Sequence, residues 1–136
     1  MAGELLADSD FFIALYKRDD TNHKRALQLL EKIGEGSMGL ALSVLAYSEV
    51  ATVLSQRVGQ TVARNFMKDT KAAGVRIIQT TDQLFERTKE IFQTQRSKNI
   101  SFTDASNITL MRMSDFDSLV NFDSDYLKND IKLFRA

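Results

Sequence analysis

The chain has 136 residues, 43% of them hydrophobic and 26% charged, which is the composition of one ordinary globular domain and not of a disordered tail. Its 18 basic residues balance its 18 acidic ones, which excludes overall positive charge as the means of binding nucleic acid. The absence of cysteine excludes disulfides, thiolate nucleophiles and Cys-ligated zinc and favours a reducing, cytoplasmic location, and no apolar run is long enough to span a membrane.

Apolar periodicity predicts strands that alternate with helices along the chain. Residues 4–7 predict a strand, and the apolar stretch at 11–16 predicts a mostly buried helix directly after it. Further strands are expected at 38–44, 75–79, 118–122 and 131–135. Further helices are expected at 24–33, 44–58, 61–72, 80–97 and 102–114. This order predicts an α/β fold whose parallel sheet is covered by helices on both faces.

Acidic residues stand where the predicted strands end or where helices begin. Asp8 follows the first strand, Asp104 opens the helix before the fourth strand, and Asp123 follows that strand. Glu49 has apolar residues at positions i−4, i−3, i+1 and i+4 of its helix, so its carboxylate is expected to face the core, unless it reaches round to solvent. Because ligands bind beyond the carboxyl ends of strands in open α/β sheets, the topology can bring these four acids to one edge.

Three of these acids also have a structural interpretation. Asp8 or its neighbour Ser9 can cap a helix, and Ser101 with Asp104 matches a capping box before an apolar run. Asp123 can begin an Asx turn. Taken singly, each residue fits the structural interpretation, and it is their joint arrangement that favours a functional site.

Carboxylates that cluster at one edge need a partner. They repel one another and raise each other's pKa, and a hard divalent cation with oxygen ligands relieves that repulsion. Mg²⁺ or Mn²⁺ is therefore the expected cofactor. Zinc is a poor fit because the chain has one histidine, His23, and no cysteine.

Four segments of the chain, in order and spacing, resemble the acidic motifs of the PIN-domain ribonucleases, most closely the VapC-like toxins of toxin–antitoxin pairs. They are LLADSDFFIAL (5–15), SVLAYSEVATVL (43–54), ISFTDASNITL (100–110) and LVNFDSDYL (119–127). The resemblance covers nearly the whole length and implies a single PIN-like domain over residues 1–136. It also implies a three-layer α/β/α fold around a central, mostly parallel five-stranded sheet.

The resemblance implies a Mg²⁺- or Mn²⁺-dependent endoribonuclease that hydrolyses RNA phosphodiester bonds. The metal-binding acids that it implies are Asp8, Glu49, Asp104 and Asp123. Within this set, Glu49 either ligates the metal or orients the attacking water. Asp10 and Asp125 are near alternatives, because each DSD sequence offers two carboxylates. Asn121 is a departure, because the family usually has Thr or Ser two residues before the fourth acid, although an amide still donates and accepts hydrogen bonds.

The expected partners also follow from the resemblance: an RNA substrate, a cognate antitoxin and a second copy of the chain in a homodimer. Six basic residues are candidates for phosphate contact or simply solvated helix faces: Lys17, Arg18, Lys24, Arg25, Arg96 and Lys98. One alternative function is a PIN-like module that binds RNA or protein without cutting. Another is a haloacid dehalogenase-type phosphatase, because LLADSD is an apolar strand followed by D-x-D, although Phe11 and Phe12 stand where that family has Gly-Thr.

Overall fold

The computed structural model describes residues 3–135, with the side chain of Ser124 left aside, and its centre is a four-stranded parallel sheet. The strand order is β3-β2-β1-β4, with β1 (Glu4–Ala7), β2 (Gly39–Ser43), β3 (Arg76–Ile78) and β4 (Leu119–Val120). The helices are α1 (Ser9–Tyr16), α2 (His23–Glu35), α3 (Val44–Arg57), α4 (Gln60–Ala72), α5 (Asp82–Thr94), α6 (Phe102–Met113) and the short 3₁₀ helix η1 (Ser124–Asn129).

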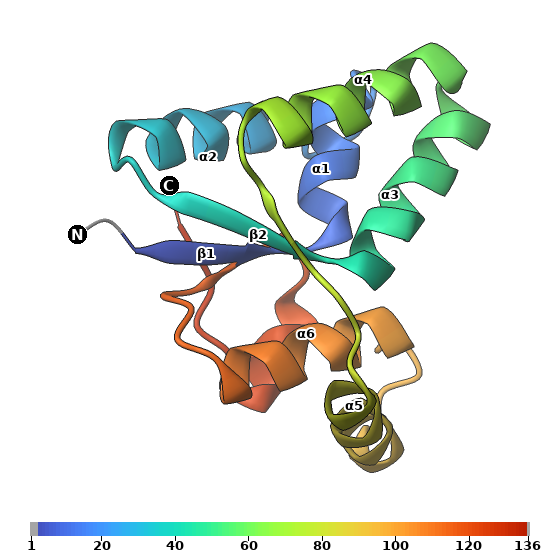
Figure 1. Ribbon diagram of the computed structural model, residues 1–136, viewed down its shortest axis with the longest axis vertical. Helices are drawn as coiled ribbons and strands as arrows, with labels where there is room; N and C mark the ends of the chain where they lie inside the picture. The colour runs from blue at the N-terminus through green and yellow to red at the C-terminus, as the bar shows by residue number, and fades with distance from the viewer. Residues whose placement is uncertain (1–2, 136) are drawn as a thin grey trace.

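Helices cover both faces of the sheet, with α1 to α4 on one side and α5 and α6 on the other (Figure 1). In β1, Leu5 and Ala7 belong to the core beneath α1 to α4, whereas Leu6 belongs to the core beneath α5 and α6. In β4, Val120 belongs to the core beneath α1 to α4 and Leu119 to the core beneath α5 and α6. Because alternate residues of a strand point to opposite faces, the sheet separates two apolar cores, and the predicted three-layer α/β/α architecture is confirmed.

The strand order reverses direction at β1, which pairs with β2 on one side and with β4 on the other. Leu6 lies opposite Leu119 and Ala7 opposite Val120, so both strands end at the same level. A point where the strand order reverses leaves a crevice beyond the carboxyl ends of the strands, and ligands of open α/β sheets bind there. The residues that follow Ala7 and Val120 therefore occupy the favoured position for a site.

The sheet has four strands among the described residues, and not the five that the sequence predicts. The segment 131–135 joins β4 through a single parallel bridge between Leu119 and Leu133. Ile131 and Leu133 are buried while Lys132 is exposed, so the alternation that predicted a strand is present. Among the described residues, the backbone hydrogen bonds between this segment and β4 all involve Leu119, with Lys132 and Phe134, so the pairing is confined to one bridge.

Side-chain oxygens begin several of the helices. Asp8, Ser43, Thr81 and Ser101 are N-caps whose side chains accept a backbone N–H of the first turn of α1, α3, α5 and α6. Such caps satisfy donors that have no partner inside the helix. Among residues 3–135, none of the helices combines the length and the apolar character needed to cross a membrane.

Candidate active site

Asp8 lies at the carboxyl end of β1, where the strand order reverses. Its backbone N–H donates to the carbonyl of Val120 at 2.9 Å, which ties it to the end of β4. Its Oδ1 accepts the N–H of Ser9 at 2.7 Å and caps α1, so the structural interpretation of Asp8 is confirmed. The side chain is only 3% exposed. A carboxylate at this depth needs further polar partners.

Those partners come from α6 and η1. The amide Nδ2 of Asn107 donates to Oδ1 of Asp8 at 3.0 Å, and the hydroxyl of Tyr126 lies 3.0 Å from Oδ2. The same hydroxyl lies 2.9 Å from Oδ1 of Asp104. Asp8 and Asp104, which are far apart in the sequence, therefore contact one buried oxygen atom.

Asp104 has two roles, one for each of its carboxylate oxygens. Its Oδ2 accepts the backbone N–H of Ser101 at 3.0 Å, and the Ser101 hydroxyl accepts the N–H of Asp104 at 3.0 Å. This is the predicted capping box at the start of α6. Its Oδ1 faces the Tyr126 hydroxyl, so the cap leaves one oxygen turned toward Asp8.

Asp10 and Asp123 stand near this pair. Oδ2 of Asp10 accepts the backbone N–H of Phe122 at 2.9 Å, whereas its Oδ1 is buried without a hydrogen-bond partner. Oδ1 of Asp123 accepts the N–H of Asp125 at 2.9 Å and begins the predicted turn. Asn121, fully buried, donates its amide to the carbonyl of Asp123 at 3.0 Å. The departure from the family pattern at Asn121 therefore supports the backbone at the fourth acid.

Burial and mutual repulsion disturb the ionisation of this cluster. The pKa of Asp8 lies well above its ordinary value, because the carboxyl is buried and because Asp10 and Asp104 are negatively charged neighbours. Burial also raises the pKa of Asp10 to about 7, opposed by the N–H of Phe122 and assisted by the charges of Asp123 and Asp104. Such a cluster favours either protons or a cation at neutral pH.

Glu49 does not face the core, and that prediction is wrong. Its side chain is exposed on α3. The buried face of α3 consists of Ala46, Val50 and Leu54, whereas Leu45 and Val53, four residues before and after Glu49, are only partly buried. Leu45, Glu49 and Val53, which follow one another along the same side of α3, thus lie at the edge of its buried face. Its apolar neighbours in the sequence do not place it in the core.

The donor chemistry of the site fits a hard divalent cation. The side chains of Asp8, Asp10 and Asp104 offer only oxygen, and Oδ1 of Asp10 is a buried acceptor without a donor. Within residues 3–135, however, no three His, Cys, Asp or Glu side chains converge into a ready-made metal site.

Asn107 and Tyr126 are site residues that the sequence did not identify. Asn107 lies one helical turn after Asp104 and so shares a face of α6 with it, a signal that was available. Tyr126 follows the second DSD sequence and fits equally well as a core aromatic. Its hydroxyl is what distinguishes it, because a buried phenol needs a polar partner.

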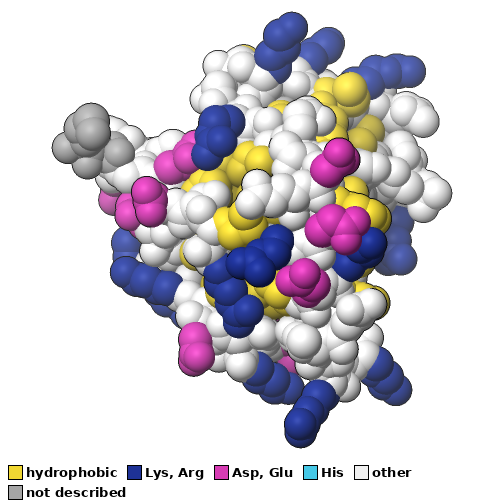
Figure 2. Space-filling view, turned by 60° about the horizontal axis from the view of Figure 1, so that its bottom comes forward, with side chains coloured by type: hydrophobic (Ala, Val, Ile, Leu, Met, Phe, Trp, Pro, Cys, Tyr) yellow, Lys and Arg dark blue, Asp and Glu magenta, His cyan; other side chains and the backbone are white. Residues whose placement is uncertain are grey.

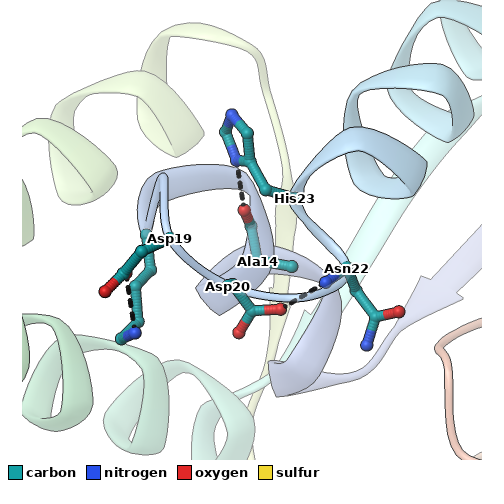
Figure 3. A network of polar contacts seen from close by, with 6 residues as sticks. Ala14, Asp19, Asp20, Asn22 and His23 are labelled. Carbon is teal, nitrogen blue, oxygen red and sulfur yellow. Dashed lines mark hydrogen bonds and ion pairs between the residues drawn. The ribbon is translucent and has the colours of Figure 1, made fainter.

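His23 has no part in the acidic cluster. Its Nδ1 lies 2.6 Å from the carbonyl of Ala14, and Figure 3 shows it beside the Asp20–Asn22 contact in the loop that connects α1 with α2. Lys17, one of the basic candidates, is paired with Asp19 at 2.7 Å. These contacts give both residues a local structural role.

Two other basic candidates lie closer to the acids. The Arg25 guanidinium stacks over the Phe122 ring at 4.9 Å, next to Asp123. Arg96 lines a hollow of about 590 Å³ together with Asp125. On the face in Figure 2, basic and acidic side chains are interspersed. A larger hollow, about 680 Å³, lies between α3, α4 and β3, and none of the predicted site residues lines it.

Comparison with known proteins identifies the family and the fold. The model of the PIN domain family matches residues 5–132. The structure is similar to that of VapC20 of Mycobacterium tuberculosis, a sarcin–ricin loop cleaving toxin, with a TM-score of 0.86 and 23% identity over 97% of this chain and 99% of that one. No curated protein sequence matches the chain significantly.

Two further solved structures have the same fold. The chain matches VapBC2 of Rickettsia felis, bound to a DNA fragment from their promoter, with a TM-score of 0.65 and 12% identity over 98% of both chains. It matches FitAcB of Neisseria gonorrhoeae with a TM-score of 0.65 and 14% identity over 96% of both chains. The similarity therefore extends over nearly the whole length of the matched chain in each of these structures.

Proposed function

We propose, because this chain belongs to the PIN domain family, that it is an endoribonuclease that uses Mg²⁺ or Mn²⁺ to hydrolyse RNA phosphodiester bonds. The observation that carries the proposal is the contact of Asp8 and Asp104 with one buried hydroxyl at the point where the strand order reverses. The raised pKa values of Asp8 and Asp10 support it, because clustered buried carboxylates are typical of sites that hold a cation.

In this proposal Asp8, Asp104 and Asp123 hold the cation. Asp10 assists them, since its unpaired Oδ1 is buried beside their charges. When bound, the cation supplies positive charge that offsets the negative charge developing on the phosphoryl and leaving oxygens. Glu49, exposed on α3, is proposed to act from the substrate side, either as a further ligand or by orienting the attacking water.

The biological role that we propose is that of the toxin in a toxin–antitoxin pair. The similarity to VapC20, described as a toxin that cleaves the sarcin–ricin loop, supports RNA as the substrate class. The similarity to VapBC2 supports an antitoxin as a protein partner. Assembly into a homodimer and a cytoplasmic location are part of the same proposal. The family match leaves the phosphatase alternative without support.

The proposal is tested by incubating single-stranded and stem-loop RNA with the protein in Mn²⁺ and in chelator. Wild type is expected to cleave only with Mn²⁺, and Asp104→Asn is expected to abolish cleavage because the amide cannot supply a charged oxygen. Ser101→Ala is the matched control, since it removes the other half of the capping box and leaves the Asp104 carboxylate in place. Metal-independent RNA binding without cleavage by wild type would instead favour the non-catalytic binding module.

A further inference from the structure

The hydroxyl of Tyr126 is held at a fixed point between two carboxylates. The tyrosine is fully buried, and its ring packs in the core beneath α5 and α6. Its oxygen lies 3.0 Å from Oδ2 of Asp8 and 2.9 Å from Oδ1 of Asp104. Because the tyrosine is fully buried among core residues, its hydroxyl is a fixed neighbour of both carboxylate oxygens.

Asn107 holds the same arrangement from α6. Its Nδ2 donates to Oδ1 of Asp8 at 3.0 Å and to the Tyr126 hydroxyl at 3.1 Å. Reversal of the amide would place its oxygen against the Asp8 carboxylate, so these contacts fix the orientation of the side chain. Asn107 and Asp104 share a face of α6, and this helix therefore orients both acids at once.

The number of protons limits what the Tyr126 hydroxyl can do. It accepts from Asn107 and has one proton, which it donates to Asp8 or to Asp104 but not to both at once. Among residues 3–135, the Tyr126 hydroxyl is the only hydrogen-bond partner of Oδ2 of Asp8 and of Oδ1 of Asp104. A buried phenol is satisfied by any single acceptor, so the structural need of Tyr126 alone does not account for two.

We propose that Tyr126 and Asn107 are positioning residues that orient Asp8 and Asp104 for one shared divalent cation. The inference rests on the proposed function of the same site. Groups that hydrogen-bond to metal ligands fix ligand orientation, and their loss typically weakens metal binding by about 10- to 100-fold. Neither residue is proposed to contact the substrate.

The test measures Mn²⁺ binding without RNA, from the electron paramagnetic resonance signal of free Mn²⁺. Tyr126→Phe removes only the hydroxyl and is expected to raise the Kd for Mn²⁺ about tenfold or more. Tyr16→Phe is the matched control, because the Tyr16 hydroxyl also contacts a carboxylate, Oδ2 of Asp69 at 2.6 Å, but at an exposed position. This control is expected to bind Mn²⁺ as wild type does.

Equal Mn²⁺ affinity of wild type and a folded Tyr126→Phe overturns the inference and leaves the proposed function standing. Failure of wild type to bind Mn²⁺ overturns both. Circular dichroism checks folding, and if Tyr126→Phe does not fold, Asn107→Leu takes its place with the same expected loss and the same refuting result. As a second readout, excess Mn²⁺ is expected to restore RNA cleavage by the variant, whereas damage to the fold lowers cleavage at every Mn²⁺ concentration.

Discussion

Substitution of Asp10 by Asn is expected to stabilise the metal-free protein at alkaline pH. Oδ2 of Asp10 accepts the N–H of Phe122, and an amide oxygen can keep that bond. Oδ1 is buried without a donor beside the charges of Asp104 and Asp123, and there the Asn amide would place N–H groups. The variant thus removes a buried charge and supplies an N–H donor close to the neighbouring carboxylates.

The size of the effect follows from the pKa of Asp10, which rises from 3.8 to about 7 on folding. Since the pKa of Asp10 is raised on folding, the folded state favours the protonated carboxyl. The contribution of Asp10 to the free energy of unfolding is therefore fully present below pH 3.8 and is lost as the pH rises through about 7. At about 1.4 kcal/mol per pKa unit, the upper limit is about 4 kcal/mol at pH 8. Because neighbouring acids share the same protons, we expect on the order of 2 kcal/mol from Asp10 alone.

The assay is urea unfolding in chelator at pH 5.5 and pH 8. Asp10→Asn is expected to exceed wild type in free energy of unfolding at pH 8, with a smaller difference at pH 5.5. Asp115→Asn, which changes an exposed aspartate, is the control and is expected to follow wild type at both values. A variant that is less stable than wild type at pH 8 would refute the reasoning, because it would mean that the Asp10 charge stabilises the fold.

Three further outcomes are expected. Mn²⁺ at 100 times its Kd at pH 8 stabilises wild type by about 2.7 kcal/mol. The same Mn²⁺ concentration stabilises it less at pH 5.5, because protons compete for the carboxyls with raised pKa and so raise the Kd; equal thermal shifts at both pH values would contradict this. Glu49→Gln changes the free energy of unfolding by less than about 0.5 kcal/mol, since the side chain is exposed, and a larger urea-measured loss would show a structural role. Ser101→Ala lowers the free energy of unfolding by about 1 kcal/mol through loss of the cap. Titration with Mn²⁺ is expected to give the same affinity for this variant as for wild type.

The fold was predictable because strands and helices differ in the period of their apolar residues. Short apolar runs marked each strand that pairs in the sheet, and side-chain caps marked helix starts such as Ser101. The prediction of a fifth strand failed because the alternation of buried and exposed residues was real but the segment pairs with β4 at Leu119 alone. Alternation reports which residues are buried, whereas pairing depends on a neighbour elsewhere in the chain.

The site was predictable where a position in the topology decides it. Asp8 and Asp104 come together because α6, the helix before β4, begins at the edge where the parallel strands end, and that rule needs no side-chain detail. The rule that failed at Glu49 was a local one, since apolar neighbours at i−4 and i+4 occur on partly buried rows as well as in the core. The proposed role of Tyr126 depends on the exact position of its hydroxyl, which must lie within hydrogen-bonding distance of both carboxylates. The spacing of residues in the sequence does not specify such a position.

The structural and functional interpretations of the acids prove compatible, because a carboxylate has two oxygens. Asp104 uses Oδ2 for the capping box and turns Oδ1 toward Asp8, and Asp10 uses Oδ2 for the Phe122 N–H and leaves Oδ1 unpaired. A backbone N–H on one oxygen restricts the direction of the other, and at Asp8 and Asp104 the side-chain contacts of Asn107 and Tyr126 add to that restriction. Helix starts and strand ends supply such N–H groups, so they hold an acid rigidly at the edge where a ligand binds. A cap is thus a means of aiming a carboxylate and not evidence against a site.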